Sequence, residues 1–192
     1  MRSVRALSVL LGLSVASLPV FSAAPVPRQS PEFVINYPGG KQALLSSYKG
    51  KVVLLAFILT TCPHCQATCQ MISKINKDLG PKGFQPLAVA INPMAVMLVN
   101  DFTKQYNVNF PVGAAEQDPV HNYLQFSVMD RMMVPQVVLI DRKGTVRFQT
   151  PPAGDEKVQN EAYLRGEIQK LLDESASSAK TGAKRPAAKK ST

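Results

Sequence analysis

The chain has 192 residues, of which 45% are apolar and 18% charged, and its formal net charge is +9. This length suits one ordinary domain, and the apolar content suffices for a packed core, which excludes a fully disordered chain. Three cysteines are too few for a disulfide scaffold, and no apolar run after residue 24 has the quality of a membrane span. The basic charge would suit a nucleic-acid binder, so its place in the chain matters.

The excess of positive charge lies at the two ends. Residues 25–174, which we expect to form the folded domain, carry 15 basic and 13 acidic side chains and are therefore close to neutral. The middle of the chain thus predicts no specific nucleic-acid partner. Residues 175–192 contain five basic residues and no large apolar side chain, which predicts a disordered basic tail. Such a tail would make weak contact with an anionic surface or remain solvated without a specific partner.

Residues 1–24 have the features of a secretory signal peptide. Arg2 and Arg5 give a basic start, an apolar stretch covers 9–20, and small residues follow at 22–24. The alternative is an uncleaved membrane anchor formed by the same run. Both interpretations predict export to the periplasm or the extracellular space, where conditions favour disulfides.

The middle of the chain predicts alternating strands and helices. An extended segment covers 33–37, and the eight apolar residues Val52–Leu59 predict a strand buried on both faces. A helix follows over 66–79, with apolar residues at spacings of three and four. The later elements are a strand, a helix, an extended segment, a short helix, a hairpin and a last helix, over 87–91, 92–106, 110–113, 120–126, 137–149 and 156–172. This order predicts an α/β fold with a mixed central sheet flanked by helices.

A CPHC motif, formed by Cys62, Pro63, His64 and Cys65, separates the buried strand from its helix. At a helix N-terminus, unpaired amides and the macrodipole stabilise a thiolate on Cys62. Pro63 suits the first helical turn, and Cys65 follows about one turn later, close enough for a small disulfide ring. A protonated His64 would stabilise the thiolate further and make the disulfide a stronger oxidant. The motif therefore predicts redox exchange.

Two other interpretations of Cys62 and Cys65 are possible from the sequence. The two cysteines could supply half of the ligands of a zinc site, or they could form a disulfide with a purely structural role. A four-ligand zinc site would need partners among Cys69, His64 and His121, and the chain has no second CxxC. We therefore expect neither a metal nor another cofactor.

The motifs of residues 33–150 resemble the thioredoxin-like superfamily, in particular its exported TlpA and redoxin branch, which is related to the AhpC/TSA peroxiredoxins. The matching segments, in the family's order, are YKGKVVLLAF at 48–57, CPHC at 62–65 and VPQVVLIDRKG at 134–144. The resemblance implies a thioredoxin-like fold in which Pro135 is a cis-proline facing the disulfide. Its use would be to leave the Val134 backbone free to pair with a substrate peptide.

On these grounds the hypothesis is thiol–disulfide exchange on exported proteins or on a cytochrome-maturation partner. Cys62 attacks, Cys65 resolves the mixed disulfide, and an upstream redox partner regenerates the pair. The chain departs from the family at Ala56 and Thr68, where many relatives carry an acidic residue. CPHC and the valine before the proline resemble the oxidant DsbA, so the direction of electron flow stays open.

Two rival functions and one extra thiol remain. An AhpC/TSA-type peroxidase would have Thr three residues and Pro seven residues before its reactive cysteine, and neither Cys62 nor Cys65 has them. An SCO-like copper assembly factor would use Cys65 and Cys69 with the distant His121, because thiolates suit Cu(I). Cys69 itself lies one helical turn after Cys65 and is either an additional resolving thiol or a small buried apolar residue.

Overall fold

The computed structural model describes residues 24–127 and 129–182. Residues 1–23 of the expected signal and residues 183–192 of the expected tail lie outside this part of the chain. None of the helices within the described ranges is long and apolar enough to cross a membrane.

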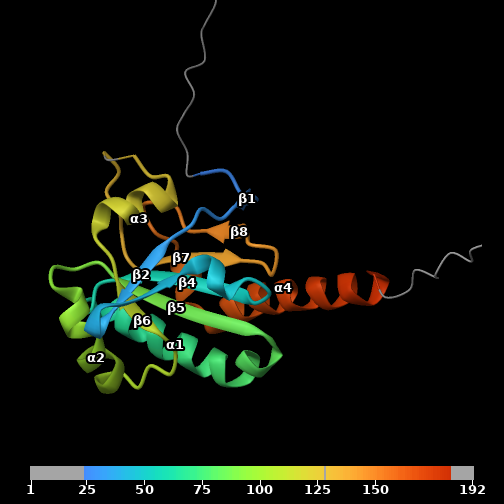
Figure 1. The fold of residues 1–192 in the computed structure, drawn as a ribbon, viewed down its shortest axis with the longest axis horizontal. Helices are drawn as coiled ribbons and strands as arrows, with labels where there is room; N and C mark the ends of the chain where they lie inside the picture. Colours follow the sequence, from blue (N-terminus) through green and yellow to red (C-terminus); the bar gives the residue numbers. More distant parts are fainter. Residues whose placement is uncertain (1–23, 128, 183–192) are drawn as a thin grey trace, which may run out of the picture.

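One mixed sheet of eight strands runs through the described domain in the order β1-β8-β7-β4-β5-β6-β2-β3 (Figure 1). The strands pair in parallel between β4 and β5 and between β5 and β6, and in antiparallel fashion elsewhere. Their bounds are β1 Arg28–Gln29, β2 Val34–Tyr37, β3 Lys41–Leu44, β4 Val52–Ile58, β5 Phe84–Ala90, β6 Val112–Ala114, β7 Gln136–Ile140 and β8 Thr145–Gln149.

Helices cover both faces of the sheet. The α-helices are α1 Pro63–Leu79, α2 Ala95–Gln105, α3 Gln117–Leu124 and α4 Glu161–Gly182, and the 3-10 helices are η1 Pro38–Gly40, η2 Leu45–Tyr48, η3 Gly80–Lys82 and η4 Glu156–Gln159. Buried residues of α1, α2 and α4 form one core cluster, and those of α3 belong to the cluster on the opposite face. The predicted α/β fold with a mixed, helix-flanked sheet is confirmed.

β4 is the central strand, and all seven of its residues are buried. Its side chains alternate between the two clusters, so that Leu54 and Ile58 face α1 while Leu55 and Phe57 pack on the α3 side. A strand enclosed on both faces explains the continuous apolar run in the sequence. This strand ends directly before the CPHC motif.

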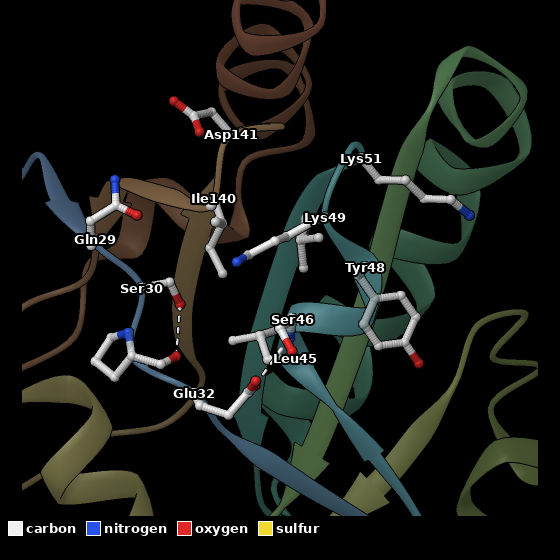
Figure 2. A pocket seen from close by; sticks show the side chains of 13 residues that line it. Gln29, Ser30, Glu32, Leu45, Ser46, Tyr48, Lys49, Lys51, Ile140 and Asp141 are labelled. Atoms are coloured by element: carbon white, nitrogen blue, oxygen red, sulfur yellow. Dashed lines mark hydrogen bonds between the residues drawn. The ribbon is translucent and has the colours of Figure 1, made fainter.

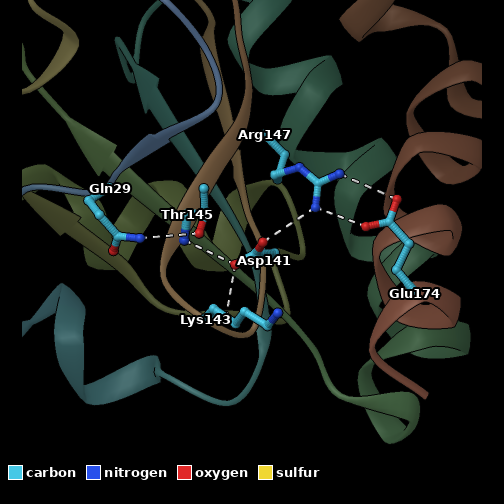
Figure 3. Close-up of polar contacts among 6 residues, drawn as sticks. All are labelled: Gln29, Asp141, Lys143, Thr145, Arg147 and Glu174. Carbon is cyan, nitrogen blue, oxygen red and sulfur yellow. Dashed lines mark hydrogen bonds and ion pairs between the residues drawn. The ribbon is translucent and has the colours of Figure 1, made fainter. Parts of the chain in front are cut away.

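The β7–β8 hairpin turns at Asp141, as the sequence predicts. The Asp141 carboxylate accepts hydrogen bonds from the backbone amides of Lys143 (2.9 Å) and Thr145 (3.0 Å) (Figure 3). Arg147 then bridges Asp141 (3.4 Å) and Glu174 of α4 (2.8 Å). The hairpin and the last helix are thereby joined.

The ends of α4 differ from the prediction over 156–172. The helix begins at Glu161 because the Asn160 side chain accepts a hydrogen bond from the Tyr163 amide (3.0 Å) and caps it, while 156–159 form the separate η4 turn. It continues to Gly182, eight residues into the segment expected to be disordered. An existing helix takes up further residues at little cost, since nucleation is the expensive step.

Candidate active site

The CPHC motif lies at the junction of β4 and α1, where the sequence places it. Cys62 is the N-cap residue of α1, and Pro63 is the first residue of the helix. The Cys62 carbonyl accepts a hydrogen bond from the Gln66 amide (3.0 Å), and its own amide donates to the Leu59 carbonyl (3.1 Å). The unpaired amides of the first helical turn therefore surround the Cys62 end of the motif.

Two side chains that sequence reasoning missed hold the loop before Cys62. Asn92, which follows β5, accepts hydrogen bonds from the Thr60 amide (3.0 Å) and the Thr60 hydroxyl (3.2 Å). The Gln66 side chain donates to the Thr60 carbonyl (2.9 Å). The ends of β4 and β5 are thus tied together beside the cysteine pair. A polar residue directly after a buried strand was the available signal for Asn92.

The three cysteines are free thiols with different exposure. Cys62 is half-buried, whereas Cys65 and Cys69 have no exposed surface. Burial raises the pKa of Cys65; the neighbouring Cys62 adds to this rise, and a backbone hydrogen bond from Leu59 opposes it. Burial alone raises the pKa of Cys69 to about 12. Cys62 is therefore the thiol of this set that a substrate can reach, and the other two favour their protonated forms.

His64 is exposed and contacts the segment before α4. Its Nδ1 atom lies 3.0 Å from Oε1 of Gln159, the last residue of η4. An amide oxygen only accepts hydrogen bonds, so Nδ1 carries the proton in this contact. Gln159 lies 95 residues from His64 in the sequence, which is why no local pattern points to it.

Val134 and Pro135 lie beside the end of β4. The peptide bond between them is cis, as the family resemblance implies. Gln136, which opens β7, is paired with Phe57 of β4, so the cis-proline lies next to Ile58, four residues before Cys62. The structure thus brings both motifs to one end of the sheet.

A buried amide organises the loop that carries Pro135. Gln136 has no exposed surface, and its Nε2 donates to the carbonyls of Met133 (2.6 Å), Pro151 (3.1 Å) and Pro152 (3.3 Å). Its Oε1 accepts from the Thr150 hydroxyl (2.5 Å). The sequence did not single out Gln136, because three of its partners, Thr150, Pro151 and Pro152, follow β8 and lie 14 to 16 residues away in the chain.

The copper-binding alternative is contradicted by the placement of its ligands. Cys65 and Cys69 pack in the cluster on the α1 face, while His121 belongs to α3, which covers the opposite face. Across residues 24–127 and 129–182, no group of three His, Cys, Asp or Glu side chains is placed to hold a metal ion. The same separation removes His121 from a zinc site with the CPHC cysteines. Thr68, three residues after Cys65 on α1, is almost fully buried, and its hydroxyl finds no hydrogen-bond partner among the described residues.

A cavity of about 180 Å³ lies away from the cysteines (Figure 2). It is lined by Val53 at the start of β4 and by Ile140 at the end of β7, which is the opposite end of the sheet. Glu32 faces it and accepts hydrogen bonds from the amides of Phe33 and Ser46, each at 3.0 Å. This carboxylate is thus engaged in local structure, and the cavity is separate from the redox pair.

A half-buried cysteine at a helix N-terminus, a buried second cysteine and an adjacent cis-proline, on a mixed sheet covered by helices, define a thioredoxin-like redox protein. The family model described as the AhpC/TSA family matches residues 26–149, and the chain belongs to this family.

Comparison with individual proteins narrows the class. The chain is 28% identical over 138 residues to thiol-disulfide oxidoreductase ResA of Bacillus thuringiensis, which covers 72% of this chain and 76% of that protein. A candidate glutathione peroxidase 8-B of Xenopus laevis is 28% identical over 98 residues, 44% of this chain and 47% of its own length. The solution structure of a candidate protein disulfide isomerase from Bacteroides thetaiotaomicron superposes with a TM-score of 0.62 at 28% identity, covering 79% of this chain and 92% of that one. The chain is accordingly a redoxin-type thiol-disulfide oxidoreductase.

Proposed function

We propose that the chain exchanges disulfides with exported proteins through Cys62 and Cys65. The observation that carries this proposal is the contrast between the two sulfurs. Cys62 is accessible at a helix N-terminus, while Cys65 is buried one turn further on, with its pKa raised by burial. Such a pair has one sulfur that meets the substrate and one that is kept protonated until it is needed.

The exchange proceeds in two balanced steps when the protein starts reduced. The Cys62 thiolate attacks one sulfur of a substrate disulfide, forms a mixed disulfide and releases the other substrate sulfur as a thiolate. Cys65 then loses its proton to that thiolate and attacks Cys62 Sγ, which releases the second substrate thiolate. Two electrons have passed to the substrate, and the protein holds a Cys62–Cys65 disulfide. The reverse sequence oxidises a substrate dithiol.

Pro135 and Val134 dock the substrate in this proposal. Proline has no backbone N–H, so pairing with an extended peptide falls to Val134. The support is positional, because the pairing of Gln136 with Phe57 places this loop beside the end of β4. The Gln136 amide holds the loop through the Met133 carbonyl.

His64 tunes the reduction potential of the pair, with Pro63 fixing the first turn of α1. The amide oxygen of Gln159 accepts the Nδ1 proton at 3.0 Å, and it also suits the doubly protonated ring. A positively charged ring two residues after Cys62 stabilises the Cys62 thiolate and therefore the reduced state of the pair.

The proposed location is outside the cytoplasm. Residues 1–24 carry the basic, apolar and small-residue regions of a signal peptide or anchor, and the 25–174 domain is followed by a basic tail. An oxidising compartment supplies protein disulfides as substrates and requires an upstream redox partner to reset the pair.

Turnover of a disulfide-bonded protein such as insulin tests the proposal. Cys62→Ala abolishes turnover, Cys65→Ala accumulates a mixed disulfide, and Cys69→Ala serves as the matched control with near-normal turnover. If Cys62→Ala retains turnover, the proposal is wrong. If the wild type consumes hydrogen peroxide faster than it exchanges disulfides, the AhpC/TSA-type peroxidase takes its place.

A further inference from the structure

Basic side chains gather at the end of the sheet opposite the redox pair. Three turns meet there: residues 49–51 before β4, residues 80–83 before β5, and the hairpin turn 141–144 between β7 and β8. These turns hold five basic residues and one acid, Asp141, whose carboxylate already binds the hairpin amides and Arg147. We call the five basic residues the basic end; they are Lys49, Lys51, Lys82, Arg142 and Lys143.

Arg142 joins the three turns into one surface. Its Nη1 donates to the Gly50 carbonyl (3.0 Å), and its Nη2 donates to the Lys82 carbonyl (3.0 Å). The Gly50 amide in turn donates to the Arg142 carbonyl (3.0 Å). The guanidinium therefore acts as a structural clamp, and the lysines of the basic end project from anchored backbone.

The four lysines of the basic end carry charge that no acid neutralises. All four are exposed. Lys51 donates to the side-chain oxygen of Gln85 (3.1 Å), which is a neutral partner. None of the four forms an ion pair with any residue in 24–127 or 129–182. Their ammonium groups are thus available to an external anion.

The acids close to the basic end are few, and each has other partners. Glu32 lines the same cavity as Lys49 (Figure 2) and accepts hydrogen bonds from two backbone amides. Asp78, near the end of α1, pairs with Arg165 of α4 (2.8 Å). With Asp141 and Glu32 both counted, basic residues still outnumber acids here by five to two. This end of the domain is therefore positively charged.

α4 leads further positive charge to the same side. The ion pair between Arg147 and Glu174 (2.8 Å) holds the helix beside the hairpin. From there α4 continues for eight residues to Gly182, about 12 Å beyond the ion pair, on the side of the β7–β8 turn (Figure 1). The sequence after Glu174 contains five basic residues and no acid. The chain therefore directs its basic C-terminal segment toward the side of the basic end.

The chemistry of these residues favours one kind of anionic partner. A lysine ammonium is a compact, strongly hydrated point charge, which suits a diffuse anionic surface better than a fixed pair of acceptors. The three turns contain no aromatic residue on which a nucleic-acid base could stack. Clusters of lysines on one side of a protein bind the headgroups of anionic lipids.

We propose that the basic end binds the surface of an anionic phospholipid bilayer. The choice of a membrane rests on the proposed location outside the cytoplasm. Cys62 lies beyond the other end of β4, whose seven residues span about 20 Å. This exceeds the Debye length of about 8 Å at physiological salt, so lipid charge leaves the cysteine pair unaffected. Bound in this way, the domain holds its redox pair away from the bilayer, where substrates reach it.

Sedimentation with lipid vesicles tests the inference on the full chain. Vesicles of phosphatidylcholine are compared with vesicles that also contain phosphatidylglycerol. Lys49→Gln, Lys82→Gln and Lys143→Gln in one variant should lower partition onto the anionic vesicles at least about tenfold, because each basic residue near such a surface is worth about fivefold. Added salt should weaken the binding of the wild type in the same way.

The matched control removes three exposed basic residues from other parts of the domain. It carries Lys74→Gln on α1, Arg131→Gln in the loop before β7 and Lys157→Gln on η4. Its partition should change less than about twofold, since these charges lie away from the bound surface. Both variants should turn over insulin like the wild type, so this inference and the proposed exchange fail separately.

Lysine acetylation on the vesicles, read by mass spectrometry, decides the question if the apolar run 9–20 holds the chain to both kinds of vesicle. Anionic vesicles should protect Lys49, Lys82 and Lys143 relative to neutral vesicles and leave Lys157 reactive. Equal reactivity of these lysines on both vesicles, or equal losses of partition in the two variants, overturns the inference. Binding of a DNA duplex without such protection on vesicles would overturn it in favour of a nucleic-acid partner.

Discussion

Replacing Gln136 by leucine should destabilise the domain and loosen the Met133–Pro135 loop, which we propose docks the substrate. The side chain is fully buried and donates to three carbonyls, of which Pro151 and Pro152 keep other donors in the amides of Gly154 and Met133. The main losses are the donor to the Met133 carbonyl and the acceptor of the Thr150 hydroxyl. An unsatisfied buried polar group costs about 1–3 kcal/mol, so the expected loss is about 2–4 kcal/mol after the gain from the apolar replacement.

Urea unfolding of the reduced full chain measures this loss from the midpoint and slope. Gln85→Leu is the matched control, because Gln85 is only partly buried and bonds to an exposed lysine and a neighbouring carbonyl. Gln136→Leu should also raise KM for a protein substrate severalfold while leaving the reaction of Cys62 with a small disulfide unchanged. A stability loss below about 1 kcal/mol, or equal losses in both variants, would refute the reasoning.

Three further outcomes are expected. His64→Leu should shift the thiol–disulfide equilibrium with glutathione about tenfold toward the oxidised protein, which corresponds to about 30 mV lower potential, and Gln159→Leu should shift it in the same direction by less. Because burial raises the pKa of Cys69 from 9.0 to about 12, the unfolded chain loses this proton first as the pH rises. Unfolding free energy should therefore fall between these two pH values, and Cys69→Ala should flatten the fall in urea titrations. Asn92→Ala should speed alkylation of Cys62 in the reduced protein by freeing the Thr60 loop, and an unchanged rate would show that this anchor is dispensable.

The sequence predicted the elements that have a strong local signature. The apolar run Val52–Leu59 and the helix after CPHC required only burial on both faces of a strand and a helical period, and both are present. The turn at Asp141 followed from its residues. By contrast, the edge strand β3 over Lys41–Leu44 was missed, because its side chains are mostly exposed and show no apolar alternation.

The site was predicted where its residues are adjacent in the chain and missed where they are not. Cys62 and Cys65 could be placed at the strand–helix junction because the motif and its flanking elements are contiguous. Asn92, Gln136 and Gln159 act through partners from other segments, and a polar residue carries no sequence signal for a distant carbonyl or ring nitrogen. Only the tertiary structure brings these residues and their partners together. It also places His121 on the opposite face of the sheet from Cys65 and Cys69, although all three residue types can bind metals.

Disulfide mapping of the oxidised protein tests the central claim most directly. The full chain is equilibrated with oxidised glutathione, alkylated, digested and analysed by mass spectrometry. The account predicts a single internal disulfide between Cys62 and Cys65, with Cys69 alkylated only after denaturation because it has no exposed surface. A Cys65–Cys69 disulfide, or a Cys62 that remains a free thiol while the protein turns over substrate, would contradict it.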